Sequence, residues 1–253
     1  MERVRTGIEG LDELLHGGII QNNGFLLEGA PGTGKTTLGI QFIYNGITKY
    51  NEPGIIVTFE ELPEQLYHDA LALSWDLRRL EQENKLRVIC TSPDVILGQT
   101  MAAGGILEQM VEETGARRIL IDSVSLFELV SEDRYNIRAR FYAFRNALKR
   151  MGLTAIFTKE VTKDILAGEI PYEEYIVDGV IRLYFQEMEG DYRERYIEIL
   201  KTRGSSFSSG KHVFRLNDKG VQALASLRHC PAHGAGCKPG KGSPGSFCCQ
   251  KSP

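Results

Sequence analysis

The 253-residue chain has no run of about 18 apolar residues and no excess of basic residues. The first absence predicts that no helix spans a membrane. The amino terminus, MERVRTGIEG, is charged and has no apolar stretch, so we expect no signal peptide. The net charge of -3 does not favour non-specific nucleic-acid binding, which usually needs a basic face. The default expectation is therefore a cytoplasmic protein.

Cysteine is scarce except near the carboxyl terminus. One of the five cysteines, Cys90, follows a strand-like run, and the other four lie in residues 226–253. An odd, clustered set does not indicate a disulfide framework. This tail is rich in Gly, Pro, Ser and Lys, and we predict that it is disordered. Its cysteines and histidines could bind zinc, but their spacing matches no standard zinc pattern, so an unliganded tail is favoured.

The hydrophobic pattern alternates between strands and helices up to about residue 158 and is mainly strand-like afterwards. No internal repeat is present. Expected strands are 24–28, 54–59, 86–91, 117–122 and 153–158, and expected helices are 35–49, 63–75, 99–115 and 133–151. Before them, Thr6–Glu9 has capping-box spacing ahead of a short helix. The prediction is one α/β domain over residues 1–225, with a mostly parallel central sheet flanked by helices and a β-rich C-terminal third.

The strongest motif is GAPGTGKT, residues 29–36, which lies between an expected strand and an expected helix. It fits the phosphate-binding P-loop pattern G-x-x-x-x-G-K-[ST]. The loop amides would hold the β-phosphate of ATP, Lys35 would reach the β- and γ-phosphates, and Thr36 would offer its hydroxyl to Mg²⁺. The predicted nucleotide-binding residues are Ala30, Pro31, Gly32, Thr33, Gly34, Lys35, Thr36 and Thr37.

Two further strands end in carboxylates. Asp122 follows an apolar run and is predicted to support the Mg²⁺ shell, although an aspartate at a strand end is also common in turns. Glu60 and Glu61 follow GIIVTF and would emerge at the P-loop edge of a parallel sheet. There a carboxylate can orient water for attack on the γ-phosphorus. The alternative is that both are solvated residues at the start of a helix near Pro63. Which glutamate is the base stays open.

The segments TGIEGLDELLHGG, GAPGTGKT, VTFEE, ILIDS and ILKTRG, in this order, resemble an ATPase domain of the KaiC-like family within the RecA-like P-loop group. The resemblance covers about residues 4–222. It implies a RecA-like fold, hexameric rings with ATP between subunits, and a catalytic role for Glu60 and Glu61. It also implies that Lys201 and Arg203 reach the γ-phosphate in the neighbouring subunit. The residues alone slightly favour another interpretation of KTRG, a basic turn that ends an exposed strand.

The chain departs from the two-domain clock members of this family in three places. It has one P-loop. Glu173, Glu174 and Tyr175 stand where the autophosphorylated Ser–Thr pair would be, and Val161 stands where an arginine would be. Self-phosphorylation is therefore uncertain.

The function predicted from the sequence is Mg-dependent ATP binding and hydrolysis by a ring-forming regulatory or signalling ATPase. One alternative is a RecA- or RadA-like DNA-handling ATPase, for which the basic residues of the helix at 133–151 could form a surface. The less specific interpretation is a solvated or subunit-facing side of that helix. Another alternative is a slow ATP-dependent binding switch. The protein partner is not predicted.

Overall fold

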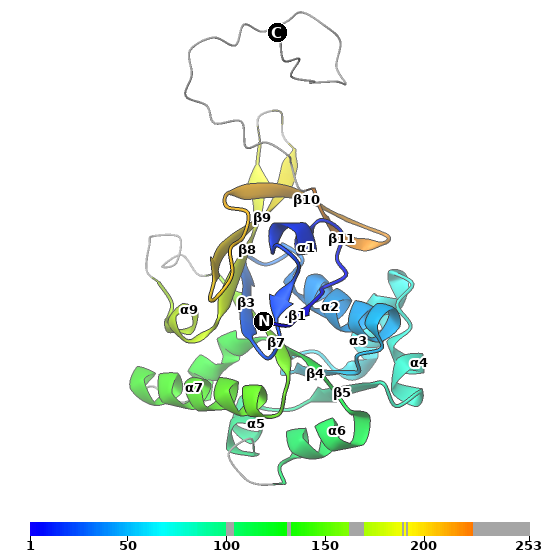
Figure 1. Ribbon diagram of the computed structural model, residues 1–253, viewed down its shortest axis with the longest axis vertical. Coiled ribbons are helices and arrows are strands. Elements are labelled where there is room, and N and C mark those ends of the chain that lie inside the picture. The colour runs from blue at the N-terminus through cyan, green and yellow to red at the C-terminus, as the bar shows by residue number, and fades with distance from the viewer. Residues whose placement is uncertain (100–103, 131–132, 162–169, 189, 191, 225–253) are drawn as a thin grey trace, which may run out of the picture.

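A nine-stranded sheet forms the centre of the molecule in the computed structural model, which describes residues 1–99, 104–130, 133–161, 170–188, 190 and 192–224 (Figure 1). The strand order is β11-β10-β9-β8-β3-β7-β6-β4-β5. The strands are β3 (Gly24–Gly29), β4 (Gly54–Thr58), β5 (Leu86–Cys90), β6 (Arg118–Asp122), β7 (Thr154–Glu160), β8 (Gly179–Glu187), β9 (Arg193–Thr202), β10 (Lys211–Asn217) and β11 (Gly220–Ala223).

The six strands from β8 to β5 are all parallel, and β9, β10 and β11 add an antiparallel edge beside β8. The mostly parallel sheet with a β-rich C-terminal third is therefore confirmed. The carboxyl ends of the parallel strands meet at one edge, because Gly29 is in register with Glu160 on β7 and Leu183 on β8. Ligands of open parallel sheets bind outside this edge.

Helices cover both faces of the sheet and bury two separate cores. On one face lie α1 (Leu11–Leu14), α2 (Lys35–Tyr50), α3 (Pro63–Ala72) and α4 (Leu77–Gln82). On the other lie α5 (Pro93–Gln99), α6 (Ile106–Thr114), the 3-10 segment η1 (Val124–Val130), α7 (Arg134–Arg150) and the short α9 (Tyr172–Ile176). Figure 1 shows α2, α3 and α4 apart from α6 and α7.

Helix α7 confirms the predicted apolar stripe. Ile137, Phe141, Phe144 and Leu148 are buried in one core, and Met151 packs against it. The edge-to-face rings of Phe141 and Phe144 against Phe157 connect this helix to the central strand β7.

Three local predictions were wrong. The helix expected over 99–115 begins only at Ile106, where Gly105 caps α6 in extended conformation, and α5 before it was not predicted. The helix expected over 63–75 ends at Ala72, because Ser74 adopts a positive φ of 63° and a new helix begins at Leu77. The predicted capping box does not form. Thr6 instead donates its hydroxyl to Asp12 at 2.8 Å, and Gly10 caps α1.

The amino-terminal lead-in also forms a two-stranded sheet, β1 (Arg3–Val4) with β2 (Ile19–Ile20), which the sequence analysis did not predict. The predicted disordered tail, 226–253, lies outside the described residues. Over the described residues, none of the helices combines the length and apolar character needed to cross a membrane.

Candidate functional site

The loop from Gly29 to Gly34 joins the end of β3 to the start of α2 and forms the centre of the site. Gly34 caps the helix with φ of 99°, a conformation that other residues adopt only with strain. A Cβ on Gly29 would lie 2.7 Å from the Thr33 hydroxyl, so the loop packs too closely there for a side chain. Thr33 is buried and donates to the Ala30 carbonyl at 2.8 Å. The chain therefore curls tightly and presents the first amides of α2, which have no intrahelical acceptor.

Lys35, the first residue of α2, lies against the inner side of this loop. Its ammonium donates to the carbonyls of Gly29 at 3.0 Å and Ala30 at 3.2 Å. Burial lowers the pKa of Lys35, and the negative charges of Glu160 and Asp122 act in the opposite direction. A partly desolvated cation beside helix amides is well suited to bind a polyphosphate.

The predicted carboxylates lie at the same edge as the P-loop. Thr58 and Asp122 are register partners at the ends of β4 and β6, and the Phe59 amide donates to the Asp122 carbonyl at 3.1 Å. The strand of Asp122 is not adjacent to the P-loop strand, because β7 lies between them. Thr158 of β7 bridges that gap by donating its hydroxyl to Asp122. This hydrogen bond positions Oδ1 of Asp122, and Oδ2 does not take part in it.

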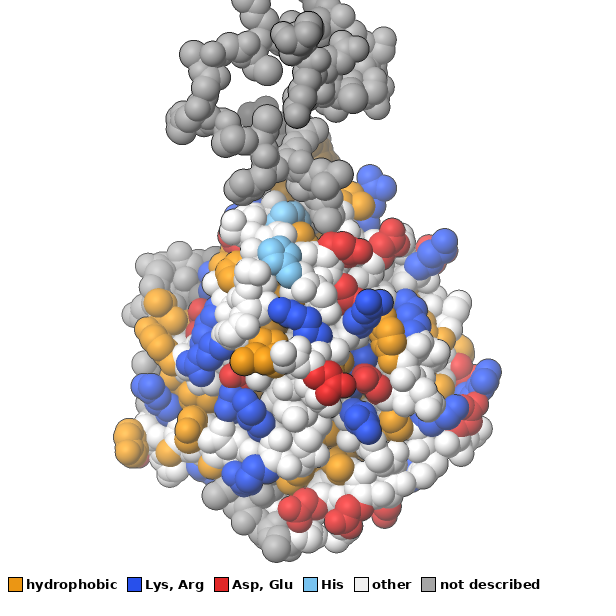
Figure 2. All heavy atoms as spheres, in the orientation of Figure 1, with side chains coloured by type: hydrophobic (Ala, Val, Ile, Leu, Met, Phe, Trp, Pro, Cys, Tyr) orange, Lys and Arg blue, Asp and Glu red, His pale blue; other side chains and the backbone are white. Residues whose placement is uncertain are grey.

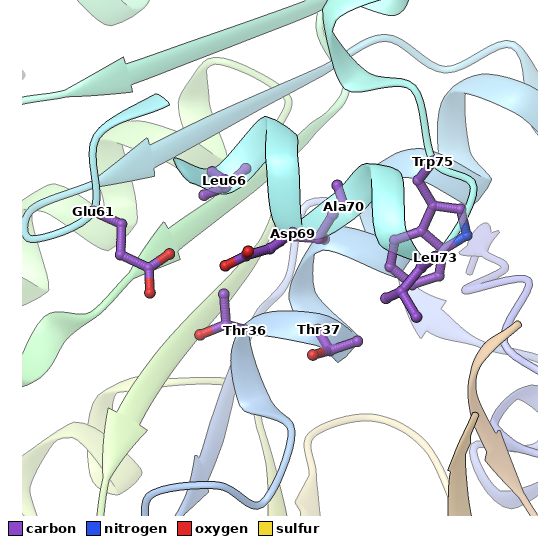
Figure 3. Close-up of a pocket in the computed structure, with 9 residues that line it drawn as sticks. Thr36, Thr37, Glu61, Leu66, Asp69, Ala70, Leu73 and Trp75 are labelled. Carbon is purple, nitrogen blue, oxygen red and sulfur yellow. The ribbon is translucent and has the colours of Figure 1, made fainter. Parts of the chain in front are cut away.

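Glu61 lines a cavity of about 160 Å³ next to the first turn of α2. A tight turn positions it, in which Thr58 donates to the Glu61 carbonyl at 2.8 Å and accepts from the Glu61 amide at 3.0 Å. Figure 3 shows the Glu61 carboxylate facing Thr36 across the cavity. Glu60 and Glu61 are both exposed, but only Glu61 is among the lining residues. The geometry therefore favours Glu61 over Glu60 as the group nearest to the phosphate end of the site.

The electrostatic surroundings of Glu61 raise the pKa of its carboxyl. Desolvation is the largest cause, followed by repulsion from Asp122, Asp69 and Glu60. A carboxylate with a raised pKa is a stronger base than an ordinary glutamate. Three acidic neighbours around one glutamate also make an electronegative pocket that a bound cation would stabilise.

Lys201 and Arg203 do not join this site within the chain. Thr202 pairs with Gly179 of β8, which pairs with Phe25 at the start of β3, whereas the P-loop follows Gly29 at its end. Phe25 and Gly29 are about 13 Å apart at the usual rise per residue. Lys201 donates to the carbonyls of Glu174 at 2.6 Å and Val177 at 2.8 Å, and Arg203 donates to that of Tyr175 at 2.7 Å. Both cations thus lie at the edge of the sheet opposite their own P-loop.

Comparison with known proteins identifies the family. The sequence model of the family described as "ATPase: KaiC" matches residues 4–228. The chain belongs to the KaiC ATPase family. It is 37% identical over 230 residues to the circadian clock oscillator protein KaiC of Synechococcus elongatus, covering 87% of this chain and 43% of that protein. The corresponding protein of Thermosynechococcus vestitus is 36% identical over 226 residues, 86% of this chain and 43% of the relative.

A shorter relative matches almost from end to end. The UPF0273 protein MJ1359 of Methanocaldococcus jannaschii is 35% identical over 237 residues, covering 87% of this chain and 96% of that protein. The chain thus spans less than half the length of the clock proteins that it matches, and nearly the full length of the archaeal one. Membership in the KaiC family establishes a RecA-like domain of the nucleotide-binding ATPase type.

The KaiC-type site contains residues that the sequence analysis missed. Asp69 of α3 projects towards the space between Glu61 and Thr36, and Trp75 closes the far end of the cavity (Figure 3). Arg195 of β9 approaches the P-loop from the other side, donating to the Gly32 carbonyl at 3.4 Å. Asp69 and Trp75 lie in an expected helix after Glu61, so helical spacing could have placed Asp69 on the P-loop side. Arg195 had no such signal, because its position depends on strand pairing.

The donors at this KaiC-type site fit Mg²⁺. Thr36 lines the cavity, Asp122 offers a second oxygen donor nearby, and hard cations such as Mg²⁺ prefer oxygen. Within the described residues no group of three or more His, Cys, Asp or Glu side chains could hold a metal ion without other ligands. Mg²⁺ usually binds through one or two protein oxygens together with substrate phosphates and water, so the two donors are sufficient.

Two basic side chains of helix α7 form ion pairs within the chain, and a third lies against an aromatic ring. Arg140 pairs with Asp94 at 3.4 Å, Arg145 pairs with Asp178, and Arg138 lies over the Tyr175 ring. On the face seen in Figure 2, basic and acidic side chains are interspersed rather than gathered by sign. For these three arginines the contacts favour a structural role over a nucleic-acid surface.

Proposed function

We propose that the chain binds Mg·ATP at its P-loop and hydrolyses it in a ring of identical copies, each site being completed by the next subunit. Lys35, Thr36 and the loop amides hold the triphosphate, and Thr36 with Asp122 holds the metal. Bound Mg²⁺ would neutralise charge on the phosphates. Glu61, assisted by Glu60, orients water for in-line attack on the γ-phosphorus.

One observation carries the composite site. Lys201 and Arg203 lie at the edge of the sheet opposite the P-loop, whereas the acidic residues and Lys35 gather at the P-loop edge. One subunit therefore presents Lys201 and Arg203 at one end of the strands and its nucleotide-binding residues at the other, so that successive subunits can meet head to tail. Heterologous contacts of this kind form a ring when the rotation between successive subunits closes. An arginine supplied in trans typically contributes ~10³–10⁵ to phosphoryl transfer.

The first test is ATPase activity per chain, measured with Mg²⁺ over a wide range of protein concentration. We expect the specific activity to rise steeply and then saturate, because an isolated subunit lacks Lys201 and Arg203 at its site. Mass measurement at each concentration should show assembly over the same range. Constant specific activity in a sample that is monomeric throughout would refute the composite site.

A slow, ATP-dependent binding switch is the second candidate. The acidic pocket around Glu61 and the P-loop support nucleotide binding whether or not turnover is fast. If ATP binds with ordinary affinity but no phosphate is released at any concentration, the switch becomes the better description. Its own test is the exchange of bound partners on ATP against ADP.

A further inference from the structure

A set of charged side chains is buried directly behind the P-loop and takes no part in the site described above. Glu28, the residue before Gly29, is in register with Lys159 on β7 and Arg182 on β8. The three therefore lie side by side on one face of the sheet, a carboxylate between two cations. Glu28 is completely buried and Lys159 nearly so. Buried charges persist only when they are paired, so this row needs a specific structural reason.

Arg182 connects two elements of the fold. Its Nε donates to Glu28 Oε1 at 2.5 Å, and its Nη2 pairs with Glu174 Oε1 at 3.1 Å. The first contact lies on the P-loop strand and the second on helix α9. Beside it, Lys159 pairs with Glu173 of the same helix at 2.6 Å. Helix α9 is thus fastened to the sheet by ion pairs at two successive residues.

Helix α9 in turn holds the two cations of the opposite edge. Lys201 and Arg203 donate to the carbonyls of Glu174, Tyr175 and Val177, which belong to the last turn and C-cap of α9. Carbonyls at a helix end have no intrahelical donor, so these contacts satisfy them. With only five residues, α9 cannot be stable alone and takes its position from its contacts. Pairing with β8 places Lys201 on β9, and α9 holds the charged ends of the Lys201 and Arg203 side chains.

We propose that Arg182 is a positioning residue that orients Lys201 and Arg203, through α9, for the nucleotide of the neighbouring subunit. The inference rests on the proposed composite site and adds a link to it. The path Glu28–Arg182–Glu174–Lys201 joins the P-loop strand of one site to the cations that serve the next. Small misplacements of catalytic groups cost about 10²-fold in rate, so loss of Arg182 should lower kcat by about 10–100-fold.

The test uses mixed rings. Arg182→Gln keeps its own P-loop, Glu60 and Glu61, and we expect it to bind ATP while turning over slowly. The Glu60→Gln/Glu61→Gln variant cannot turn over but carries intact Arg182, Lys201 and Arg203. When this partner is added in excess, each Arg182→Gln site gains a correctly positioned neighbour. Its kcat per site should rise to within about threefold of wild-type chains mixed with the same excess.

The controls separate this role from damage to the fold. A partner that also carries Arg182→Gln should give no rescue, and Arg203→Ala rescued by the original partner shows that subunits mix. Arg79→Gln, a surface arginine paired with Glu83, should leave kcat unchanged. If Arg182→Gln does not fold, Glu174→Gln cuts the ion pair but keeps the carbonyl that accepts Lys201, and it should show a smaller defect that is rescued in the same way.

Failure of rescue in rings that mix and in which wild-type chains are active would overturn the role of Arg182 alone. Absence of turnover in wild-type rings would overturn the proposed function, and the role of Arg182 with it.

Discussion

At the scale of single residues, the site depends on how neighbouring charges change one another. Glu61 lies at the cavity with Asp69, and its neighbour Glu60 does not line it. Lys35 has its pKa lowered by burial and remains close to Glu160 and Asp122. The surroundings of Glu61 thus make it a stronger base, and those of Lys35 make it a desolvated ligand for phosphate.

The two glutamates should differ in their effect on turnover. We expect Glu61→Gln to lower kcat by ~10²–10⁴, the usual contribution of a general base, and Glu60→Gln to lower it less. Because the pKa of Glu61 is raised, the kcat of the wild type should fall on acidification at a higher pH than it would with an ordinary glutamate as the base. Single-turnover rates with ATP from pH 5 to 8 would measure both. Equal losses for the two variants would contradict the assignment drawn from the cavity.

Glu28 gives a prediction about stability rather than rate. Burial is the main cause that raises its pKa from 4.5 to about 7, against the attraction of Arg182. The folded state therefore holds a proton that the unfolded chain has released, and the free energy of unfolding falls as pH rises from about 4.5 to 7. Glu28→Gln has no such proton.

The free energy of unfolding of Glu28→Gln, relative to the wild type, should therefore increase between pH 5 and 8. The increase is on the order of 1–3 kcal/mol for a shift of this size. Urea unfolding of both proteins at several pH values measures this difference. The test is how the difference in free energy of unfolding changes with pH, because its absolute size also includes the lost contact to Arg182. Parallel curves for the two proteins would show that Glu28 stays ionised when buried.

At the scale of elements, helix α2 shows how packing can override helix propensity. Gly46 lies in its interior, where alanine is normally more stable by about 1 kcal/mol. A Cβ at Gly46, however, would lie 2.4 Å from Cδ of Arg118. That arginine is fully buried and pairs with Glu52, the Phe42 carbonyl and the Arg5 carbonyl. It cannot move aside without breaking these contacts.

Gly46→Ala should therefore lower the free energy of unfolding by about 1–3 kcal/mol, the usual cost of overpacking. Gly98 in α5 is the matched control, because a Cβ there meets no atom within 4 Å. Gly98→Ala should be neutral or stabilising by up to about 1 kcal/mol. Urea unfolding of both variants distinguishes the cases. A stabilised Gly46→Ala would mean that Arg118 has room to shift.

At the scale of the whole molecule, the sheet separates two half-sites. The acidic residues and P-loop occupy the carboxyl edge of the parallel strands, and Lys201 and Arg203 occupy the other edge. This arrangement is the physical basis of the head-to-tail assembly that we propose. It also means that variants of the two half-sites should complement each other.

Arg203→Ala alone and Glu60→Gln/Glu61→Gln alone should each have little ATPase activity. In an equal mixture, about a quarter of all sites combine intact glutamates with an intact neighbouring Arg203, so activity should recover to about that fraction of the wild type. Phosphate release measured after subunit mixing tests this. No recovery in rings shown by mass to be mixed would place Arg203 outside the neighbouring site.

Much of the fold and part of the site were predictable from local pattern. Buried parallel strands appear in the sequence as apolar runs, and α7 appears as apolar residues at helical spacing. Both patterns arise because one side or both sides of a regular element are buried. The P-loop was predictable because few sequences allow the loop that its ligand needs. Other local features could not be predicted, because long-range contacts decide them. They are the helix end near Ser74, the start of α6, the contact of Thr6 with Asp12 and the β1–β2 pair.

The sequence by itself therefore determined the α/β class, the P-loop and the acidic residues that follow two of its strands. Only the tertiary structure decided that β7 separates Asp122 from the P-loop strand and that Glu61 rather than Glu60 lines the cavity. It also decided that Glu28, Arg182 and α9 form one buried path to Lys201. The reason is physical. Apolar periodicity records which face of an element is buried, but strand order and register bring distant charges together, and no local repeat encodes them.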